Sequence, residues 1–402
     1  MKKKKNNRQE REGSIMEISL RIVMEKAKSA DVTVIVGAGA RGKELFGKLA
    51  NQDQIVITAF FDNREELIGK DIEGIKIVKP CKLEENNAAY IIAVDAKEAR
   101  KELLLQLKEL GVKEESVITY YYNRDYDYMS NLDEKYYQEE IDNMYYERFG
   151  KRINWQNPVT YNEKINWEKL NVKNDQRTRL VDKYLVREWV KAKIGESYLT
   201  KLYGVWSNPE EINFSSLPNA FVLKLNNGSG RNIIVKDKGQ IQQDTVCKQL
   251  NEWKKHNFAY ASYEFQYRDI EPKIICEEYL EGMAESVYDY NIYCFHGEPE
   301  YIWCIKGSHR PGCQASFYNK DWEMQPFSYG YPKDLVLAPK PNKLNEMLKL
   351  SRILSEEFKH VRVDWYNLPN GRVLFGEMTF STWSGLAKWE PEEYDIVFGN
   401  LI

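Results

Sequence analysis

The sequence predicts a protein of mixed α/β and α+β class, and three observations lead to this expectation. Its 402 residues exceed the length of one ordinary domain, so two or more domains are expected. The apolar run VTVIV is followed directly by a glycine-rich turn and a helical pattern, as in a parallel sheet covered by helices. Near the C-terminus, two alternating segments flank the turn sequence NLPNG, which predicts an antiparallel hairpin.

The composition is that of a globular protein and excludes several functional classes. Hydrophobic residues make up 43% of the chain and aromatic residues 13%, which is ample for a core. The formal net charge of −3 predicts no bulk attraction to nucleic acid or to an anionic membrane. No apolar run has the length of a membrane span and no signal-peptide pattern occurs, so we expect a cytoplasmic protein without stable membrane insertion.

Cysteine and histidine usage disfavours a metal centre built on those residues. The six cysteines form no CxxC pair or zinc spacing, and Cys276, Cys294 and Cys304 lie in strand-like apolar runs where small buried thiols are ordinary. We therefore expect reduced thiols. Four histidines in the whole chain are too few to favour a histidine-based metal site or catalytic triad.

The chain is expected to divide into four segments. The basic N-terminus lacks periodicity and predicts disorder, and the tyrosine-rich stretch from Tyr120 to Trp167 predicts one or two amphipathic helices. The expected segments are a disordered basic tail over residues 1–15, a Rossmann-like domain over 16–122, a helical linker over 123–168 and a second α/β domain over 169–402.

The Rossmann-like domain contains a glycine pattern typical of nucleotide binding. Gly37, Gly39 and Gly42 complete GxGxxG at the end of the first strand. Asp62 ends the second strand, where a ribose-binding acid would stand. The helix after the turn would present its N-terminus to a phosphate. We therefore expect a nucleotide site, and the alternative is a scaffold whose glycines serve only the turn. The domain also resembles the small nucleotide-sugar-binding domains of several polysaccharide-modifying enzymes, which implies a nucleotide sugar as its ligand.

The C-terminal hairpin carries two acids on adjacent strands. Asp364 lies in VRVDWY and Glu377 in RVLFGEM, and a hairpin can bring two such residues onto one face. Facing carboxylates repel each other unless a cation lies between them or one is protonated. Because Mg²⁺ prefers carboxylate oxygens together with water or phosphate oxygens, we expect a Mg²⁺ site shared with a nucleotide. The alternative is two solvated charges on an exposed sheet face.

Upstream, a lysine lies within an apolar strand beside a glycine loop. Lys224 stands in FVLKL, and a buried lysine needs an anionic partner. Gly228, Ser229 and Gly230 follow closely, and their backbone N–H groups could close over phosphates. Lys183, at the start of the predicted helix DKYLVREWV, is either a phosphate contact or a solvated helix charge.

The order of these motifs resembles an ATP-grasp enzyme. Arg362, Asp364, Glu377 and Thr379 follow the Arg-Asp…Glu-Asn pattern of ATP-grasp ligases, downstream of DKY, FVLKLNNGSGRNIIV and IICEEYL. The strings NPVTYNEKINW, LVDKYLVREWV and FGEMTFSTWSG are similar to one branch, the teichuronopeptide-biosynthesis-type (TupA-like) ATP-grasp proteins of surface-polysaccharide pathways. The resemblance covers roughly residues 128–402, so it implies an ATP-grasp catalytic fold over 169–402.

The resemblance implies a role for each motif residue. Arg362 and Lys224 would be catalytic, and Thr379 departs from the usual asparagine, which weakens the case for two fully coordinated metals. The helix in NPVTYNEKINW would shape the acceptor side, unless Thr160 and Glu163 only form a capping box. The implied site comprises Lys183, Lys224, Gly228, Ser229, Gly230, Glu277, Glu278, Tyr279, Leu280 and Glu285 for ATP, Asp364, Glu377 and Thr379 for metal, and Asp289, Asn291 and Arg310 for substrate.

The implied function is an ATP- and Mg²⁺-dependent ligase that activates a carboxylate as an acyl phosphate and joins it to an amine. Expected partners are a small-molecule or polysaccharide-precursor acceptor, an amine or amino acid and a nucleotide sugar, with no nucleic acid. The rival functions are a sugar kinase on the same fold, a glycosyltransferase acting through the N-terminal domain and a non-catalytic nucleotide sensor.

Overall fold

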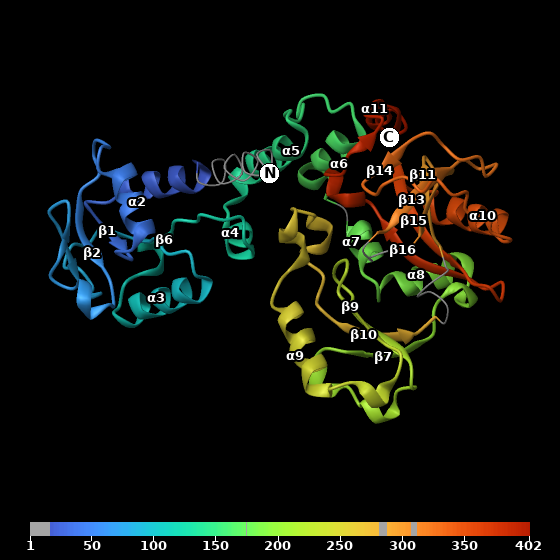
Figure 1. Cartoon of the computed structure of the whole chain (residues 1–402), viewed down its shortest axis with the longest axis horizontal. Helices are drawn as coiled ribbons and strands as arrows, with labels where there is room; N and C mark the ends of the chain where they lie inside the picture. The colour runs from blue at the N-terminus through green and yellow to red at the C-terminus, as the bar shows by residue number, and fades with distance from the viewer. Residues whose placement is uncertain (1–16, 174, 281–287, 307–311) are drawn as a thin grey trace. The chain divides into compact units, whose positions relative to one another are not determined.

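The chain folds as two units, of which unit 1 ends at Asn143 and unit 2 begins at Met144 (Figure 1). This division falls within the segment predicted to be a helical linker. Three sequence predictions, namely the basic tail, Glu285 and Arg310, lie outside the described residues. The structure is a computed structural model that describes residues 17–173, 175–280, 288–306 and 312–402.

Unit 1 is built on a sheet with helices on both faces. Its elements are a helix over residues 17–28, β1 Val32–Val36, α2 Ala40–Leu49, β2 Ile57–Phe61, β3 Asp71–Ile72, β4 Ile75–Val78, β5 Ala88–Ile92, α3 Lys97–Glu109, β6 Val117–Thr119 and α4 Tyr126–Asn131. The strand order is β3-β4-β2-β1-β5-β6, parallel from β4 to β6, with β3 antiparallel at one edge.

The two faces of this sheet bury alternate residues of the same strands. Ile35 packs with Phe46 of α2 and with Val23 of the first helix. Its neighbour Val34 faces the opposite side and packs with Leu107 of α3. Since successive side chains of a strand point to opposite faces, a sheet covered on both sides needs continuous apolar strands such as VTVIV. The Rossmann-like fold predicted from the sequence is therefore confirmed.

Unit 2 is organised around antiparallel sheets. Its elements are α5 Tyr137–Phe149, which begins in unit 1, α6 Tyr161–Asn171, α7 Asp175–Val181, α8 Val186–Ile194, β7 Leu202–Trp206, β8 Phe221–Leu225, β9 Asn232–Val235, α9 Gln243–Lys254, β10 Ile274–Glu278, β11 Tyr288–Phe295, β12 Glu298–Lys306, β13 Gln314–Tyr318, β14 Ser328–Tyr329, α10 Leu344–Ser355, β15 His360–Asn367, β16 Val373–Thr379, β17 Trp389–Glu390 and α11 Glu393–Gly399. One sheet has the order β7-β10-β8-β9, a second has β13-β12-β11-β15-β16, and β14 pairs with β17.

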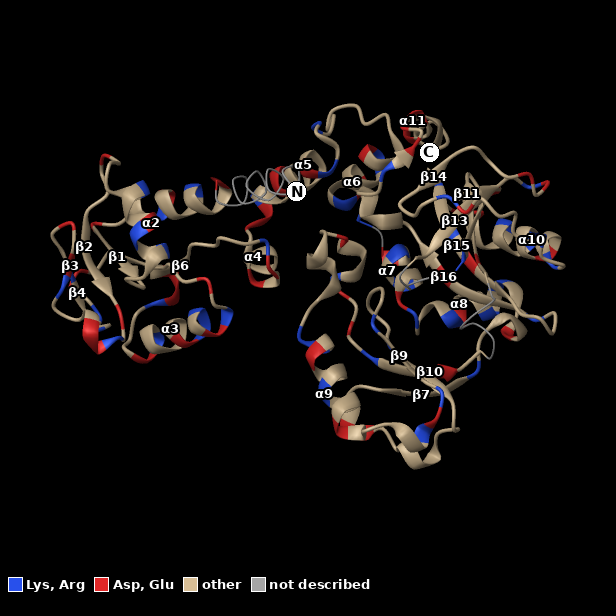
Figure 2. Ribbon diagram, viewed as in Figure 1, with Lys and Arg blue, Asp and Glu red and all other residues tan. Residues whose placement is uncertain are grey.

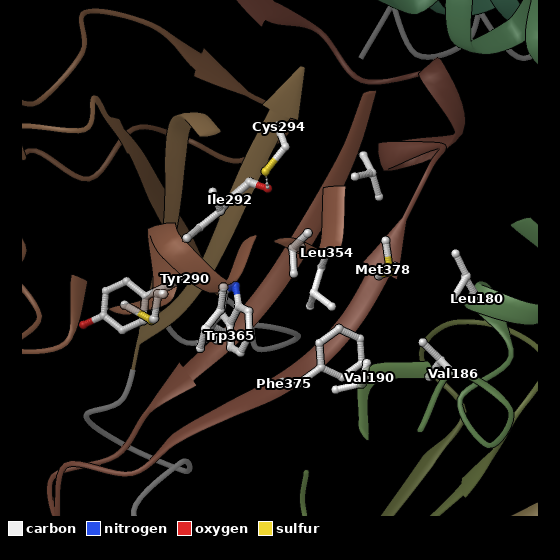
Figure 3. Packing of buried hydrophobic residues seen from close by; sticks show 14 of the residues in the cluster. Leu180, Val186, Val190, Tyr290, Ile292, Cys294, Leu354, Trp365, Phe375 and Met378 are labelled. Carbon is white, nitrogen blue, oxygen red and sulfur yellow. Dashed lines mark hydrogen bonds between the residues drawn. The ribbon is translucent and has the colours of Figure 1, made fainter. Parts of the chain in front are cut away.

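A hydrophobic cluster joins the second sheet to α8 and α10 (Figure 3). Ile292 of β11, Trp365 of β15 and Leu354 of α10 are fully buried in it. Trp365 Nε1 also donates a hydrogen bond of 2.8 Å to Ser351 Oγ, so its polar atom is satisfied. Burial of each such side chain stabilises the fold by about 1.5–3 kcal/mol. The cluster therefore fixes the two strands that carry the predicted acids.

Two hairpins shape the second sheet, and the one predicted around NLPNG is confirmed. β11 and β12 close at His296 and Gly297, whose φ angles of 49° and 82° are those of a turn with two left-handed residues. β15 and β16 pair antiparallel around NLPNG, where Gly371 has φ of 83°. Helix α10 precedes this hairpin and ends at Ser355.

Two helix predictions need correction. The stretch Tyr120–Trp167 contains α4, α5 and the first part of α6 rather than one or two helices, because the side chains of Asp125 and Thr160 each cap a new helix start. The helix predicted for DKYLVREWV begins only at Val186, since Asp182 Oδ1 accepts from the amides of Tyr184 and Leu185 and holds a turn first.

Charged residues of both signs are interspersed over both units, in keeping with the small net charge (Figure 2). Within the described ranges, no helix combines the length and the apolar character that crossing a membrane requires. Cys276, Cys294 and Cys304 are buried free thiols, as predicted.

Glu168 on α6 should make unit 2 sensitive to acid. Burial alone would raise its pKa, but His360 Nε2 at 2.9 Å and Arg177 Nη1 at 2.7 Å lower the pKa to about 2. Stability from this group is present above its unfolded pKa and is lost as pH falls toward its folded pKa. Between pH 7 and 3.5, we expect the unfolding free energy of wild type to fall by about 1.4 kcal/mol more than that of Glu168→Gln.

Urea unfolding followed by tryptophan fluorescence measures this effect in unit 2 alone, because all ten tryptophans lie after Asn143. Glu188→Gln, an exposed substitution on α8, is the control. Equal pH slopes for wild type and Glu168→Gln would contradict the prediction.

Candidate active site

Unit 2 contains a pocket of about 690 Å³ lined by strands of both main sheets. It brings together most of the site residues predicted from the sequence. Those that line it are Lys183, Lys224, Ser229, Gly230, Glu277, Asp289, Asn291, Arg362, Asp364, Glu377 and Thr379. Gly228, Glu278, Tyr279 and Leu280 are not part of this lining.

Arg362 holds the two predicted metal-binding acids together. Its Nε and Nη2 donate to the two oxygens of Asp364 at 2.7 and 2.6 Å, and Nη2 also lies 3.2 Å from Glu377 Oε1. Thr379 Oγ1 donates to Glu377 Oε1 at 2.9 Å. Gly376 makes the approach possible, because a Cβ there would lie 3.1 Å from the Asp364 carbonyl oxygen. Asp364 is buried, whereas Glu377 is partly exposed, so only Asp364 departs from the alternative of two solvated charges.

The two acids differ in their proton affinity. Burial raises the pKa of Asp364 to about 7 against the opposing effect of Arg362, and the nearby charge of Glu377 raises it further. Burial also acts to raise the pKa of Glu377, but Lys183 and Arg362 outweigh it and hold that pKa below its ordinary value. A cation between the carboxylates would favour the ionised form of both.

Lys183 lies between the glycine loop and the acids. Its Nζ donates to the carbonyl oxygen of Gly228 and is 3.5 Å from Glu377 Oε2. Its backbone N–H donates to the carbonyl oxygen of Asn226 at 3.1 Å, which ties the turn before α8 to the start of the loop. Gly228 has φ of 151°, and a Cβ there would lie 2.7 Å from Phe258. Only glycine therefore fits this loop position.

Lys224 has the anionic partner that its apolar strand requires. Its Nζ donates to Glu277 Oε2 at 2.7 Å, while Glu277 Oε1 accepts from Arg187 at 2.7 Å and from Thr200 at 2.9 Å. Burial acts to raise the pKa of Glu277, but Lys224 and Arg187 outweigh it and lower the pKa. Glu277 is thus a buried, fully hydrogen-bonded acid and not a solvated strand end.

The other three residues implied for ATP at the end of β10 differ in exposure: Glu278 and Tyr279 are partly exposed and Leu280 is buried. Glu278 forms a two-fold ion pair with Arg372 at 3.0 and 3.1 Å, and Leu280 packs against Leu368 and Leu374. In the second sheet, Asn291 lies opposite Asp364 in the strand register, so it joins the acids at the pocket wall.

Several pocket residues were missed by sequence reasoning. Arg187 lies in the first turn of α8, and no local pattern in the sequence marked it as part of the site. Glu264, Ser381, Trp383 and Ser384 also line the pocket. Ser381 and Trp383 lie in the string FGEMTFSTWSG, which carried the family resemblance without a role for these two positions.

The donor set suits magnesium better than zinc. Among the described residues, no group of three or more His, Cys, Asp and Glu side chains is arranged to hold a metal ion. Asp364 and Glu377 offer carboxylate oxygens, and Thr379 adds a hydroxyl. Mg²⁺ keeps several water or phosphate ligands and needs few from the protein, whereas structural zinc needs nitrogen or sulfur donors.

Unit 1 has a pocket of its own, of about 410 Å³, at the carboxyl ends of β1, β2 and β5. Gly37, with φ of 111°, would bring a Cβ within 2.7 Å of Val94, and a Cβ on Gly42 would lie 1.8 Å from the Gly37 carbonyl oxygen. These two glycines are required by the turn itself. Gly39 leaves room, since its Cβ would meet only Arg64 at 3.6 Å.

Asp62 braces the glycine turn of unit 1. It accepts from the Ala38 amide at 2.8 Å and from the Arg64 guanidinium at 2.8 and 2.7 Å. The hydrogen bonds from Arg64 lower the pKa of Asp62 to about 2. Its ribose-binding role stays a prediction, because both oxygens already have partners within the chain.

A double-mutant cycle should reveal strong coupling between Lys224 and Glu277. Removing one member leaves the other charge buried with fewer partners, whereas removing both avoids that cost. We expect Lys224→Met and Glu277→Gln to destabilise unit 2 separately, with a coupling free energy of at least about 1 kcal/mol. Urea unfolding by tryptophan fluorescence gives the four values, with exposed Lys248→Met as the control. Additive effects would contradict a direct buried interaction.

Comparison with known proteins gives a family but distant structures. No curated protein matches. Solved structures similar to this chain include the D-alanine–D-alanine ligase from Bacillus anthracis complexed with ATP, at 14% identity over 87% of this chain and 86% of that one, TM-score 0.32. The L-amino acid ligase from Bacillus licheniformis has 10% identity over 91% of this chain and 71% of that one, TM-score 0.36. At this distance we infer nothing about the site from them.

Two family models match separate parts of the sequence. The model described as C2185-like, N-terminal, matches residues 30–118, within unit 1. The model described as TupA-like ATPgrasp matches residues 163–402, which is more than half of the chain and includes every residue of the unit 2 pocket except Met144. The chain therefore belongs to the TupA-like ATP-grasp family.

Proposed function

We propose that unit 2 is an ATP-dependent ligase that activates a carboxylate as an acyl phosphate and joins it to an amine. One observation carries the proposal: a single pocket holds two lysines, a glycine loop and the Asp364–Glu377 pair. Phosphoryl transfer depends on positioning and charge neutralisation, which these groups can supply together. Membership of the TupA-like ATP-grasp family supports ATP as the phosphoryl donor.

The cations of the pocket suit a nucleotide triphosphate. Lys183 and Lys224 each already contact a carboxylate, so phosphate oxygens would exchange for existing partners rather than meet bare charges. The loop of Gly228, Ser229 and Gly230 can add backbone N–H donors. Glu277, Glu278, Tyr279 and Leu280 are proposed to contact the base and ribose, as the family resemblance implies.

The carboxylate pair is proposed to hold magnesium. Asp364, Glu377 and Thr379 would be its protein ligands. When bound, Mg²⁺ would neutralise charge on the transferring phosphates. Arg362 keeps one guanidinium nitrogen, Nη1, directed at Thr382 Oγ1 at 3.4 Å and away from the acids, which supports a role in steadying an oxyanion. Asp289 and Asn291 are proposed to contact the carboxylate substrate.

We propose a uronic-acid sugar or an amino acid of a surface-polysaccharide pathway as the carboxylate substrate. The support is the resemblance to teichuronopeptide-type enzymes and the presence of a Rossmann-like unit 1, which would bind a nucleotide or nucleotide sugar. A sugar kinase would use the same ATP-binding groups, so the product formed from the acceptor separates the two functions.

The test combines product analysis with trapping. The full chain is incubated with ATP, Mg²⁺ and a panel of uronic acids and amino acids, with and without amines, and ADP is measured. We expect ADP formation that depends on the carboxylate and, with hydroxylamine as the amine, a hydroxamate seen by mass spectrometry. A stable phosphorylated sugar, or ADP without hydroxamate, would contradict ligation.

Glu377→Gln should abolish this activity while the fold persists. Loss of one charge at the carboxylate pair should weaken Mg²⁺ binding and lower kcat/KM by at least about 100-fold, as removal of one electrostatic group in an active site does. Glu298→Gln, which breaks an exposed ion pair with Arg352, is the matched control and should keep full activity. Near-normal turnover of Glu377→Gln at limiting Mg²⁺ would contradict the assignment.

An acidic side chain at position 39 should weaken ligand binding to unit 1 and leave ATP binding to unit 2 unchanged. The pocket has room for a side chain there, and an acid at the N-terminus of α2 would repel phosphate. We expect Gly39→Asp to lose binding of a uridine nucleotide sugar by at least about tenfold, which is 1.4 kcal/mol, and Gly39→Ala to retain it. Calorimetry measures this, with binding of an ATP analogue to unit 2 as the internal reference. If Gly39→Asp and Gly39→Ala bind the nucleotide sugar equally well, this turn of unit 1 does not bind its phosphates.

A further inference from the structure

The loop that follows β16 has an unusual backbone. Trp383 and Ser384 have φ of 51° and 55° with ψ of 23° and 24°, and Gly385 has φ of 62°. These are three consecutive left-handed residues, of which only the last is a glycine. The left-handed conformation costs a residue with a side chain about 1–2 kcal/mol. Such a conformation persists only where the surrounding structure imposes it, and it is often kept for function.

Helix α6 and β14 impose this conformation. Asn166 Nδ2 donates to the Gly385 carbonyl oxygen at 2.9 Å, and Asn162 Nδ2 donates to the Ala387 carbonyl oxygen at 3.0 Å. The Tyr329 hydroxyl donates to the Thr382 carbonyl oxygen at 3.1 Å. Two side chains of NPVTYNEKINW, Asn162 and Asn166, therefore hold the loop by hydrogen bonds to its carbonyl oxygens. The capping box of Thr160 and Glu163 starts the same helix.

This loop presents an indole to the pocket. Trp383 lines the pocket with 45% of its surface exposed, next to the ring of Tyr331 at 5.2 Å and 74°. Tyr331 in turn stacks on Trp303 at 5.7 Å and 24°. We call Trp303, Tyr331 and Trp383 the aromatic wall. Gly330 makes room for it, since a Cβ there would lie 2.8 Å from Trp383 Nε1.

Two polar atoms beside this wall have no hydrogen-bond partner among the residues that the structure describes. They are Ser384 Oγ and Trp303 Nε1, both on residues that line the pocket. Ser384 is only 8% exposed. A buried polar group without a partner costs about 1–3 kcal/mol, so native structures seldom keep one without cause. Both atoms are themselves buried, so a ligand hydroxyl can pair with them only after the side chains that cover them shift.

We propose that the aromatic wall binds the pyranose ring of a carbohydrate acceptor. One face of a pyranose consists of C–H groups and suits the exposed indole of Trp383, while its hydroxyls can pair with Ser384 Oγ and Trp303 Nε1 once the side chains that cover these atoms shift. The loop begins three residues after Thr379, and Thr382 Oγ1 is 3.4 Å from Arg362, so a bound sugar lies beside the carboxylate pair. This inference rests on the proposed function and narrows its substrate to a cyclic sugar.

The experiment measures binding without requiring turnover. Saturation-transfer NMR is recorded on the full chain with a non-hydrolysable ATP analogue and Mg²⁺. The probes are methyl glycosides of glucuronic acid, galacturonic acid and N-acetylglucosamine, in which the ring is locked, with open-chain gluconate and glutamate as comparators. We expect ring-proton saturation for at least one locked glycoside and a dissociation constant at least tenfold lower than that of gluconate. No preference for a locked ring would overturn the proposal.

The key variant is Trp383→Gly, because glycine accepts the left-handed conformation and removes the indole without backbone strain. We expect at least a tenfold loss of glycoside affinity in Trp383→Gly, a smaller loss in Trp383→Phe and a three- to tenfold loss in Ser384→Ala. The melting temperature of Trp383→Gly should equal or exceed that of wild type. A marked fall in melting temperature together with unchanged glycoside binding would make Trp383 a packing residue and overturn the proposal.

Tyr146→Ala is the matched control, since this ring is equally exposed at 46% but lies outside the pocket. It should leave glycoside affinity unchanged. If Trp383→Gly lowers the affinity for the ATP analogue instead, the wall belongs to the nucleotide and the proposal fails. If glycoside binding depends on Trp383 but no pair of carboxylate and amine supports ATP turnover, the sugar-binding proposal is supported and the proposed ligase function is contradicted.

Discussion

The pocket of unit 2 depends on one electrostatic arrangement, the Arg362 guanidinium held between Asp364 and Glu377. Two acids on neighbouring strands of a buried sheet would repel each other, and Arg362 offsets that repulsion with contacts of 2.6 and 3.2 Å from one nitrogen. Removing the arginine would leave Asp364 buried without its ion-pair partner, which is costly. The rest of the pocket is arranged around this neutralised centre.

The same principle extends across the pocket. Lys183 contacts Glu377, and Glu277 is shared between Lys224 and Arg187. Each of these cations is thus paired with an acid. Under the proposed function, a polyphosphate with its metal would exchange for these partners at a site whose charges are already in position. Preorganised charges of this kind need little rearrangement during reaction.

Local sequence chemistry predicted a large part of this structure. The glycine turn after β1, the hairpin of β15 and β16 and the anionic partner of Lys224 all follow from short patterns with a direct physical cause. Short patterns could not reveal that Glu277 also accepts hydrogen bonds from Arg187 and Thr200, because these residues lie 90 and 77 positions away in the sequence. The left-handed conformation of the Trp383 loop could not be predicted from local sequence either, since Asn166, which bonds to Gly385, lies 219 residues upstream.

The central claim, activation of a carboxylate as an acyl phosphate, can be tested by isotope transfer. The carboxylate substrate that supports ADP formation is labelled with ¹⁸O in both oxygens and converted by the full chain with ATP and amine. Attack of the carboxylate on the γ-phosphoryl group moves one labelled oxygen into the inorganic phosphate that leaves after amine attack. We predict one ¹⁸O atom per phosphate released, measured by mass spectrometry, and phosphate without ¹⁸O would contradict this account.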